Sequence, residues 1–258
     1  MNILEQFRLF TTLVIQFLTV FYAYQVIYIL ISIIKRKVAS LKDTDIRNRF
    51  AIFISARNEE GVISELLDSL NKQEYPRDKY DIYVVADNCT DHTAQVSRDN
   101  GAIVYERFNK EEVGKGYALN YLYTKVSSLK GRKYYDAFVV FDADNIVDPA
   151  FLKESNKKLA SGKYDAFTTY RNSKNFGTNW LSAAYSIWFL HEARHLNYVR
   201  DMIGAQCMIS GTGFVITSSL MDENDGWPYY FLTEDIQFSV ASTINNKRIG
   251  YCDSAMLY

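Results

Sequence analysis

Asp142 and Asp144 stand one residue apart, directly after the apolar run Phe138–Phe141. Two carboxylates at this spacing can share one hard cation that also binds phosphate oxygens. Mg²⁺ or Mn²⁺ suits this task, because both take oxygen ligands and keep positions open for substrate. A D-x-D pair is more often a solvated turn, but its place after a strand-like run favours a metal site. The pair therefore predicts Mg²⁺ or Mn²⁺ bound by Asp142 and Asp144.

Two other segments have polar residues at positions where ligands bind. Asp87 follows the apolar run Asp81–Ala86, and its carboxylate could accept a hydrogen bond from the imide of uracil or, alternatively, form an Asx turn or a helix cap. Gly114-Lys115-Gly116 precedes a helical pattern and looks like a phosphate loop. However, Asn109 and Gly116 stand where a P-loop needs Gly and Ser or Thr, so this is not the signature of a nucleoside triphosphatase.

His191-Glu192-Ala193-Arg194-His195 matches H-E-x-x-H, in which two histidines one helical turn apart bind zinc and the glutamate activates water. The longer H-E-x-x-H-x-x-G-x-x-H pattern fails, because Tyr198 and Asp201 stand where Gly and the third His are needed. A glutamate further along, such as Glu223 or Glu234, would complete a zinc site. A membrane-anchored zinc metalloprotease is therefore an alternative function.

The elements that must position these residues are short apolar runs that alternate with helical patterns from Phe50 onward. This alternation predicts an α/β fold with a mostly parallel sheet flanked by helices. Ligands bind beyond the carboxyl ends of such strands, so the acidic loops after the runs should line one edge of the sheet. The predicted strands are Phe50–Ser55, Asp81–Ala86, Ala102–Glu106 and Ala137–Phe141. The predicted helices are Val62–Asn71, a helix that begins at Thr93, Gly116–Leu129, a helix that begins near Pro149, Trp180–Tyr198 and Glu234–Thr243. Asp148 is the predicted cap of the helix near Pro149, and Thr233 is that of the last helix.

Residues 9–34 carry no charged side chain, and as a helix they are long enough to cross a hydrocarbon core of about 30 Å. Lys35, Arg36 and Lys37 follow this span, against Arg8 alone before it, so the positive-inside rule places the rest of the chain in the cytoplasm. We therefore predict a cell-membrane protein with a single-pass transmembrane anchor and basic stop at 1–37, a polar linker at 38–49 and a catalytic domain at 50–258.

The composition narrows the class of protein further. Apolar residues make up 48% of the chain and Pro is scarce, so the chain folds. A net charge of −1 without a basic stripe argues against nucleic acid as a partner. The three cysteines lack any C-x-x-C spacing, which agrees with a reducing compartment.

Five motifs occur in an order and spacing that resembles family 2 glycosyltransferases, the group that includes cellulose, chitin, hyaluronan and poly-N-acetylglucosamine synthases. They are S-A-R-N-E-E at 55–60, V-V-A-D-N-C-T-D-H-T at 84–93, G-K-G-Y-A-L-N at 114–120, D-A-D at 142–144 and T-E-D at 233–235. The segment Ser210–Gly213 also lies where such enzymes keep an acceptor-side loop, although a plain turn has the same composition. The resemblance covers Phe50 to about Asp253.

The resemblance implies a GT-A type α/β domain that transfers sugar from a UDP-sugar, with inversion, to a saccharide or lipid-linked acceptor. It implies that Asp235 is the general base, that Asp142 and Asp144 hold the metal on the diphosphate, and that Asp87 contacts the uracil. The residues that it places at the substrates are Glu59, Asp87, Lys115, Gly211, Thr212 and Glu234.

One departure from the family pattern concerns the C-terminal part. Processive members carry Q-x-x-R-W downstream of T-E-D, followed by further membrane helices. Between Asp235 and Tyr258 this sequence has neither the Q-x-x-R-W motif nor a further apolar span. We therefore expect the catalytic domain to be truncated at its C-terminus, which leaves processivity open. A membrane-tethered module that binds a nucleotide sugar without transferring it is a third possible function, and neither the sugar nor the acceptor is specified by the motifs.

Overall fold

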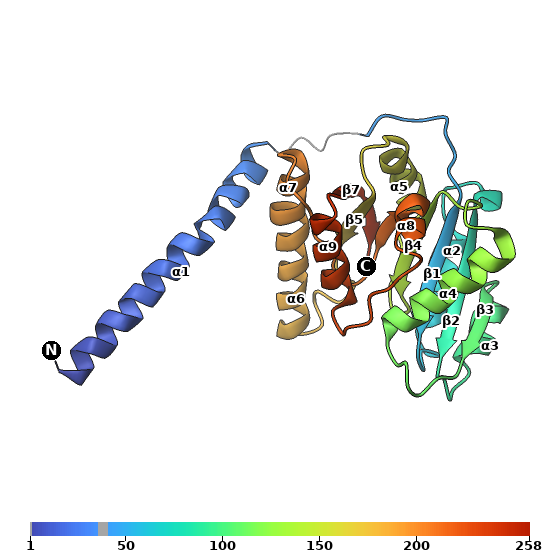
Figure 1. Ribbon diagram of the computed structural model, residues 1–258, viewed down its shortest axis with the longest axis horizontal. Coiled ribbons are helices and arrows are strands. Elements are labelled where there is room, and N and C mark those ends of the chain that lie inside the picture. Colours follow the sequence, from blue (N-terminus) through green and yellow to red (C-terminus); the bar gives the residue numbers. More distant parts are fainter. Residues whose placement is uncertain (1, 36–40) are drawn as a thin grey trace.

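The computed structural model describes residues 2–35 and 41–258. A long helix, α1 (Ile3–Ile34), stands apart from an α/β domain and contains the whole predicted span (Figure 1). Its start is fixed by a capping box, because Asn2 accepts a hydrogen bond from the Glu5 amide and the Glu5 side chain accepts one from the Asn2 amide. Within the described residues, α1 is the one helix long and apolar enough to cross a membrane, by length and composition alone. The predicted basic residues Arg36 and Lys37 and the first part of the predicted linker, 38–40, lie outside the described residues.

The domain is built on a seven-stranded sheet of order β3-β2-β1-β4-β6-β5-β7. Strands β3, β2, β1 and β4 pair in parallel, and β5 pairs in parallel with β7. Strand β6 runs antiparallel to its two neighbours, β4 and β5. The strands are β1 (Phe50–Ala56), β2 (Tyr80–Asp87), β3 (Ile103–Arg107), β4 (Ala137–Asp142), β5 (Ala166–Arg171), β6 (Phe214–Thr217) and β7 (Ile249–Leu257). The predicted mostly parallel α/β sheet is confirmed.

Helices cover both faces of the sheet. They are α2 (Ile63–Asn71), the 3₁₀ turn η1 (Arg77–Lys79), α3 (Thr93–Asp99), α4 (Lys115–Lys130), α5 (Phe151–Ala160), α6 (Trp180–Leu190), the π-helical segment η2 (His191–Asn197), α7 (Tyr198–Met202), α8 (Ser218–Glu223) and α9 (Glu234–Ile244). Alternate side chains of β1 point to opposite faces, so Phe53 packs in the cluster that contains Leu122 of α4, and Ile52 packs in the cluster that contains Leu66 of α2. Burial on both faces explains why β1 is apolar at nearly every position.

The four predicted strands and the helices between them are confirmed, with differences at three places. The helix expected near Pro149 begins at Phe151, and its cap is Ala150 instead of the predicted Asp148. The Asp148 carboxylate accepts a hydrogen bond from the Ala150 amide at 2.9 Å in the turn before the helix. Thr233 precedes α9 without a side-chain capping bond, so its predicted role as a cap is wrong. The helix expected over Trp180–Tyr198 changes to π geometry within its second half. Strands β5, β6 and β7 were not predicted.

Candidate active site

Asp87 lies at the carboxyl end of β2, where its buried carboxylate is held by two arginines. Oδ1 accepts a hydrogen bond from Arg107 Nη1 at 2.7 Å, and Oδ2 lies 3.9 Å from Arg57 Nη2. Arg107 is buried as well, so this ion pair is fixed at the end of two neighbouring strands. The sequence placed Asp87 correctly at the carboxyl end of the second strand but did not reveal either arginine as its partner.

Glu59 lies in the loop after β1, which is joined to the start of α3 by a hydrogen bond from the Glu59 amide to Thr93 Oγ1 at 2.8 Å. Burial raises the pKa of the Glu59 carboxyl, and the neighbouring carboxylates of Asp144, Asp91 and Asp142 raise it further. Acidic groups from the loops after β1, β2 and β4 therefore face a common space. This is the acidic edge that the sequence predicted.

Lys115 is the first residue of α4, and its ammonium group joins three segments of the chain. Nζ donates hydrogen bonds to Asp142 Oδ1 and to the carbonyl oxygen of Gly211, the latter at 2.6 Å, and it lies 3.8 Å from Glu234 Oε1. Glu234 is buried, and burial raises the pKa of its carboxyl although Lys115 nearby favours the ionised form. Three other predicted site residues, Asp142, Gly211 and Glu234, are thus brought together around the amino group of Lys115.

The loop Ser210–Gly213 is fastened to the end of β4. The Asp142 amide donates to Thr212 Oγ1 at 2.9 Å, and that hydroxyl donates to Asn145 Oδ1 at 2.5 Å. Gly211 and Gly213 have φ angles of 64° and 65°, in the left-handed region that favours glycine. The loop therefore has a specific conformation beside the D-A-D motif.

Asp235 lies in the first turn of α9 and reaches the same loop. Its Oδ2 accepts a hydrogen bond from the Gly211 amide at 2.6 Å, and its Oδ1 accepts one from the Ile236 amide at 2.8 Å. The N-terminus of a helix is a favourable place for a negative charge. Asp235 is half-buried, so its carboxylate is oriented by the protein and remains accessible.

The donor set at this edge fits a hard divalent cation. Asp142 is partly exposed and Asp144 is exposed, so both carboxylates can meet an incoming ligand. Within the part of the chain that the structure describes, no group of three or more His, Cys, Asp or Glu side chains is placed to hold a metal by itself. Mg²⁺ and Mn²⁺ commonly use one or two carboxylates and take their other ligands from substrate phosphates and water. Asp142 and Asp144 therefore stay the predicted metal ligands.

Arg171, at the end of β5, is a residue of this site that the sequence prediction missed. Its Nη2 lies 3.7 Å from Glu192 Oε2 and donates to Ser210 Oγ at 3.2 Å, and its guanidinium lies 4.0 Å from the centre of the Phe189 ring. Burial lowers the pKa of Arg171, whereas Glu192 and the carboxylates of the acidic edge favour its charged form. Arg171 directly follows the run Ala166–Tyr170, so recognising that strand would have identified it.

The H-E-x-x-H segment lies in η2, and its side chains have partners on different elements. Glu192 faces Arg171, whereas His195 Nδ1 lies 2.6 Å from Ser32 Oγ of α1. The rings of His191 and His195 are 5.8 Å apart, centre to centre. Through these contacts the segment connects α1 with Arg171, which in turn binds Ser210 of the Ser210–Gly213 loop.

The G-K-G-Y-A-L-N motif holds the segment that leads to T-E-D. A Cβ on Gly116 would lie 1.8 Å from the carbonyl oxygen of Tyr229, so only glycine allows this approach. The Tyr117 ring stacks on the Tyr230 ring at 4.2 Å. Asn120 Oδ1 accepts a hydrogen bond from the Trp227 amide at 3.0 Å. The motif thus positions Glu234 and Asp235 in addition to supplying Lys115.

Replacing Gly116 with Ala should destabilise the protein, because the added methyl group would overlap backbone atoms that cannot rotate away. Overpacking of this kind costs about 1–3 kcal/mol of unfolding free energy. Gly61→Ala is the matched control, because a Cβ on Gly61 would have no other atom within 4 Å. Denaturant unfolding of both variants measures the effect, and equal stabilities would show that Gly116 is not a close-packing position.

The chain matches the family described as Glycosyltransferase like family 2 over residues 48–258. It is 24% identical to the beta-monoglucosyldiacylglycerol synthase of Synechocystis sp. over 204 residues, which cover 77% of this chain and 41% of that protein. It is 40% identical over 215 residues to the poly(ribitol-phosphate) beta-N-acetylglucosaminyltransferase TarS of Staphylococcus aureus, covering 81% of this chain and 35% of TarS. The chain thus spans about two-fifths of the length of these curated relatives.

Solved structures share the fold. The mannosyltransferase PcManGT from Pyrobaculum calidifontis, in complex with GDP-Man and Mn²⁺, superposes with a TM-score of 0.67 at 21% identity, covering 94% of this chain and 66% of that one. TarS in complex with UDP-GlcNAc superposes with a TM-score of 0.56 at 18% identity, covering 81% of this chain and 57% of that one. At these identities the likeness shows the fold, which is the one expected from the motifs.

Proposed function

This chain belongs to the family 2 glycosyltransferases, and from that membership we propose that it transfers a sugar from a nucleotide diphosphate donor to a lipid-linked or saccharide acceptor at the membrane. The observation that carries the proposal is the cluster at the carboxyl edge of the sheet. There Lys115 contacts Asp142, and the loop at Gly211 joins Lys115 to Asp235. Asp142, proposed to bind the cation, and Asp235, proposed as the base, are thus linked through Lys115 and the loop at Gly211.

Each of the site residues has a separate proposed role in the reaction. Asp235 removes the proton from an acceptor hydroxyl while that oxygen forms a bond to the anomeric carbon of the sugar. The bond from the anomeric carbon to the diphosphate breaks on the opposite face, so the configuration inverts. Asp142 and Asp144 would hold the divalent cation, and a bound cation would supply positive charge to the diphosphate leaving group. Lys115 places a second positive charge beside Asp142.

The donor proposed here is a UDP-sugar, with Asp87 beside the base. The support is the V-V-A-D-N-C-T-D-H-T motif, because Asp87 lies at the end of β2 with its carboxylate fixed by Arg107. PcManGT was solved with GDP-Man and TarS with UDP-GlcNAc, so both nucleotides occur among proteins of this fold. A direct comparison of UDP and GDP donors is therefore part of the test.

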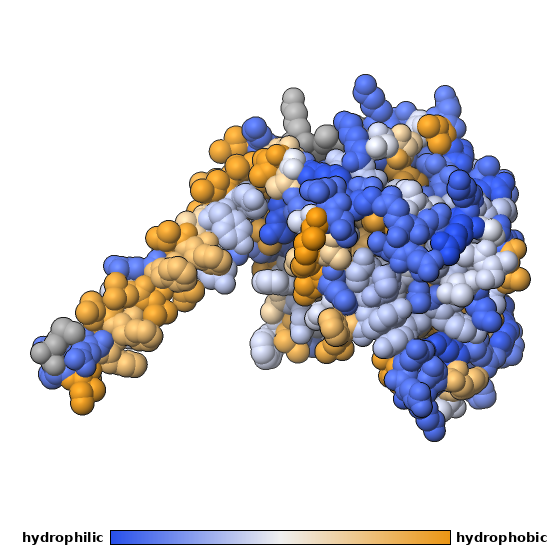
Figure 2. Space-filling model, viewed as in Figure 1, coloured by the Kyte–Doolittle hydropathy of each residue, from blue (hydrophilic) through white to orange (hydrophobic). Residues whose placement is uncertain are grey.

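Anchoring in the cell membrane through α1, with the domain on the cytoplasmic side, is part of the same proposal. Nearly all large apolar side chains of α1 are exposed, and Figure 2 shows apolar residues in orange over most of the helix, with paler and blue residues between them. The positive charge of Lys35 and of the two basic residues after it favours a cytoplasmic location for the α/β domain. The name of the Synechocystis relative indicates a glycolipid product, which supports a membrane lipid as acceptor.

The test is a transfer assay with the chain in lipid vesicles that contain bacterial membrane lipids, Mn²⁺ and a panel of donors: UDP-glucose, UDP-GlcNAc and GDP-mannose. We expect release of UDP together with labelled lipid or saccharide from one UDP-sugar. Donor binding without release of diphosphate would identify a binding module instead of an enzyme. Release from GDP-mannose alone would overturn the role proposed for Asp87.

A further inference from the structure

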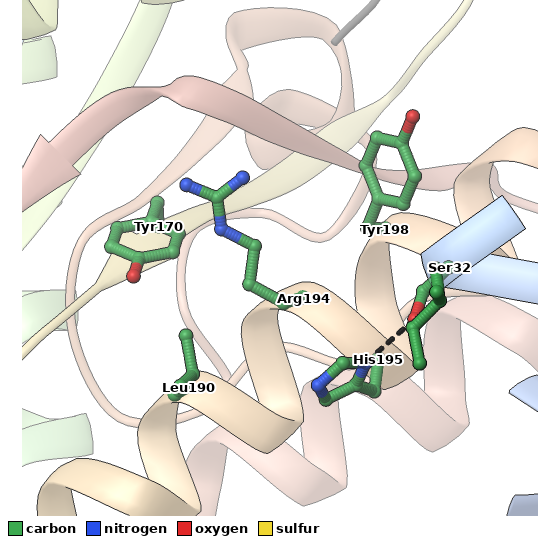
Figure 3. Close-up of a pocket in the computed structure, with 7 residues that line it drawn as sticks. Ser32, Tyr170, Leu190, Arg194, His195 and Tyr198 are labelled. Atoms are coloured by element: carbon green, nitrogen blue, oxygen red, sulfur yellow. Dashed lines mark hydrogen bonds between the residues drawn. The ribbon is translucent and has the colours of Figure 1, made fainter. Parts of the chain in front are cut away.

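A cavity of about 350 Å³ lies where α1 meets the domain (Figure 3). The last turn of α1 contributes Ser32 and Ile33 to its lining. On the domain side, Leu190 ends α6, and Arg194 and His195 come from η2. The two sides are held together by the contact of 2.6 Å between Ser32 Oγ and His195 Nδ1. The cavity is therefore closed on one side by the proposed membrane anchor.

The polar groups of this cavity carry no uncompensated charge. Arg194 Nη1 lies 3.3 Å from Asp253 Oδ2, and its guanidinium stacks 4.8 Å from the centre of the Tyr170 ring. Burial lowers the pKa of His195, and the nearby His191 and Arg194 lower it further, which favours the uncharged imidazole. An anion would therefore gain little here, whereas hydroxyl and ester groups can form hydrogen bonds.

The surroundings of the cavity are apolar. The side chains of α1 are exposed along its length, and α6 exposes Trp180, Tyr185 and Trp188 on the element that leads to the cavity. Figure 1 shows α6 and α7 standing between α1 and the sheet, so both apolar surfaces lie on the same side of the domain. With α1 in a bilayer, Ser32 and Ile33 lie at the end of the apolar stretch, close to the level of lipid headgroups.

One helical segment connects this cavity with the active site. Arg194 and His195 of η2 line the cavity, whereas Glu192 of η2 pairs with Arg171. Arg171 in turn binds Ser210, the residue before the glycine that holds Asp235. Single-turn π segments within helices occur frequently at functional sites.

We propose that this cavity binds the uncharged, hydroxyl-bearing head of a membrane lipid. The inference rests on the proposed function, under which this lipid is the acceptor. Leu190 and Ile33 contact the apolar part of the lipid, and Arg194, Ser32 and His195 provide hydrogen-bonding groups for its ester oxygens, which leaves its hydroxyl for Asp235. The cavity is linked to the Ser210–Gly213 loop through the contacts of Glu192 with Arg171 and of Arg171 with Ser210.

The test uses the chain in phosphatidylcholine vesicles that contain diacylglycerol with a photoreactive diazirine near the head of one acyl chain. After illumination, mass spectrometry should locate the label on the last turn of α1 and on residues 190–198. Leu190→Trp fills the cavity and should reduce this labelling about tenfold, which corresponds to about 1.4 kcal/mol of binding free energy. Ile33→Trp, on the opposite wall, should give the same loss. Ile187→Trp is the matched control, because Ile187 is exposed on α6 and does not line the cavity.

Undiminished labelling of residues 190–198 in both tryptophan variants would overturn the assignment of the cavity. If phosphatidic acid with the same diazirine chain labels the cavity as strongly as diacylglycerol or more strongly, the proposal that the lipid head is uncharged is overturned. Titration of the same samples with UDP and Mn²⁺ separates this inference from the proposed function. Labelling of the cavity in a protein that does not bind UDP would support the lipid site and contradict the proposed UDP-sugar donor. UDP binding without labelling would support the donor site and contradict the lipid site.

Discussion

Asp235→Asn is expected to abolish sugar transfer while nucleotide binding remains. Asn has the size of Asp, and its side-chain oxygen can still accept the hydrogen bond from the Gly211 amide, so the loop should keep its conformation. It cannot accept a proton from the acceptor hydroxyl at neutral pH. A positioned general base contributes roughly 10²–10⁴-fold to a rate, and we expect a loss of that size in the turnover of the bound donor.

The control for this variant is Asp68→Asn, the same chemical change at an exposed position on α2. It should leave both transfer and binding at the parental level. Rates of labelled product formation and affinities for UDP are measured on the same samples. Transfer by Asp235→Asn at near the parental rate would show that Asp235 is not the base and that the T-E-D motif serves only to begin α9.

Asp142→Ala and Asp144→Ala are expected to weaken UDP binding strongly in the presence of Mn²⁺. Burial raises the pKa of Glu59 and the neighbouring carboxylates raise it further, so this edge already carries mutually repelling charges, to which a diphosphate would add. Loss of groups that only orient metal ligands costs about 10–100-fold in metal affinity, so loss of a ligand itself should cost at least about tenfold.

Asp68→Ala is the matched control for these two variants and should bind UDP as the parent does. With a chelator present, neither active-site variant should bind UDP more weakly than the parent, because without the cation the lost carboxylate would only have repelled the diphosphate. Either variant binding UDP as tightly as the parent in Mn²⁺ would contradict the assignment of that aspartate as a metal ligand.

The part of the fold that could be predicted is the part governed by local pattern. β1, β2 and β4 are buried on both faces, so their apolar runs are continuous and their ends are marked by acidic residues. Because these strands are parallel, the sequence also placed Glu59, Asp87 and Asp142 at one edge. The prediction of a GT-A domain came from the resemblance of the five motifs to family 2 glycosyltransferases.

The remaining features depend on contacts between distant segments. β6 has only four residues and forms its ladders with β4 and β5, which precede it by long stretches of chain. The H-E-x-x-H pattern suggested zinc because it was considered as one helix, whereas Glu192 pairs with Arg171 of β5 and His195 contacts Ser32 of α1. Lys115 was expected near the donor, but its bond to the Gly211 carbonyl depends on how α4 packs beside the loop before β6.

Metal-dependent binding of a nucleotide diphosphate sugar is tested most directly by calorimetric titration of UDP-glucose and UDP-GlcNAc into the unaltered protein, with Mn²⁺ and then with excess chelator. Binding of at least one of these donors in Mn²⁺, lost when the metal is removed, is the result that the carboxylates of Asp142 and Asp144 predict. Equal affinity with and without chelator, or no binding of either donor by the folded protein, would contradict a metal-dependent glycosyltransferase site at this edge of the sheet.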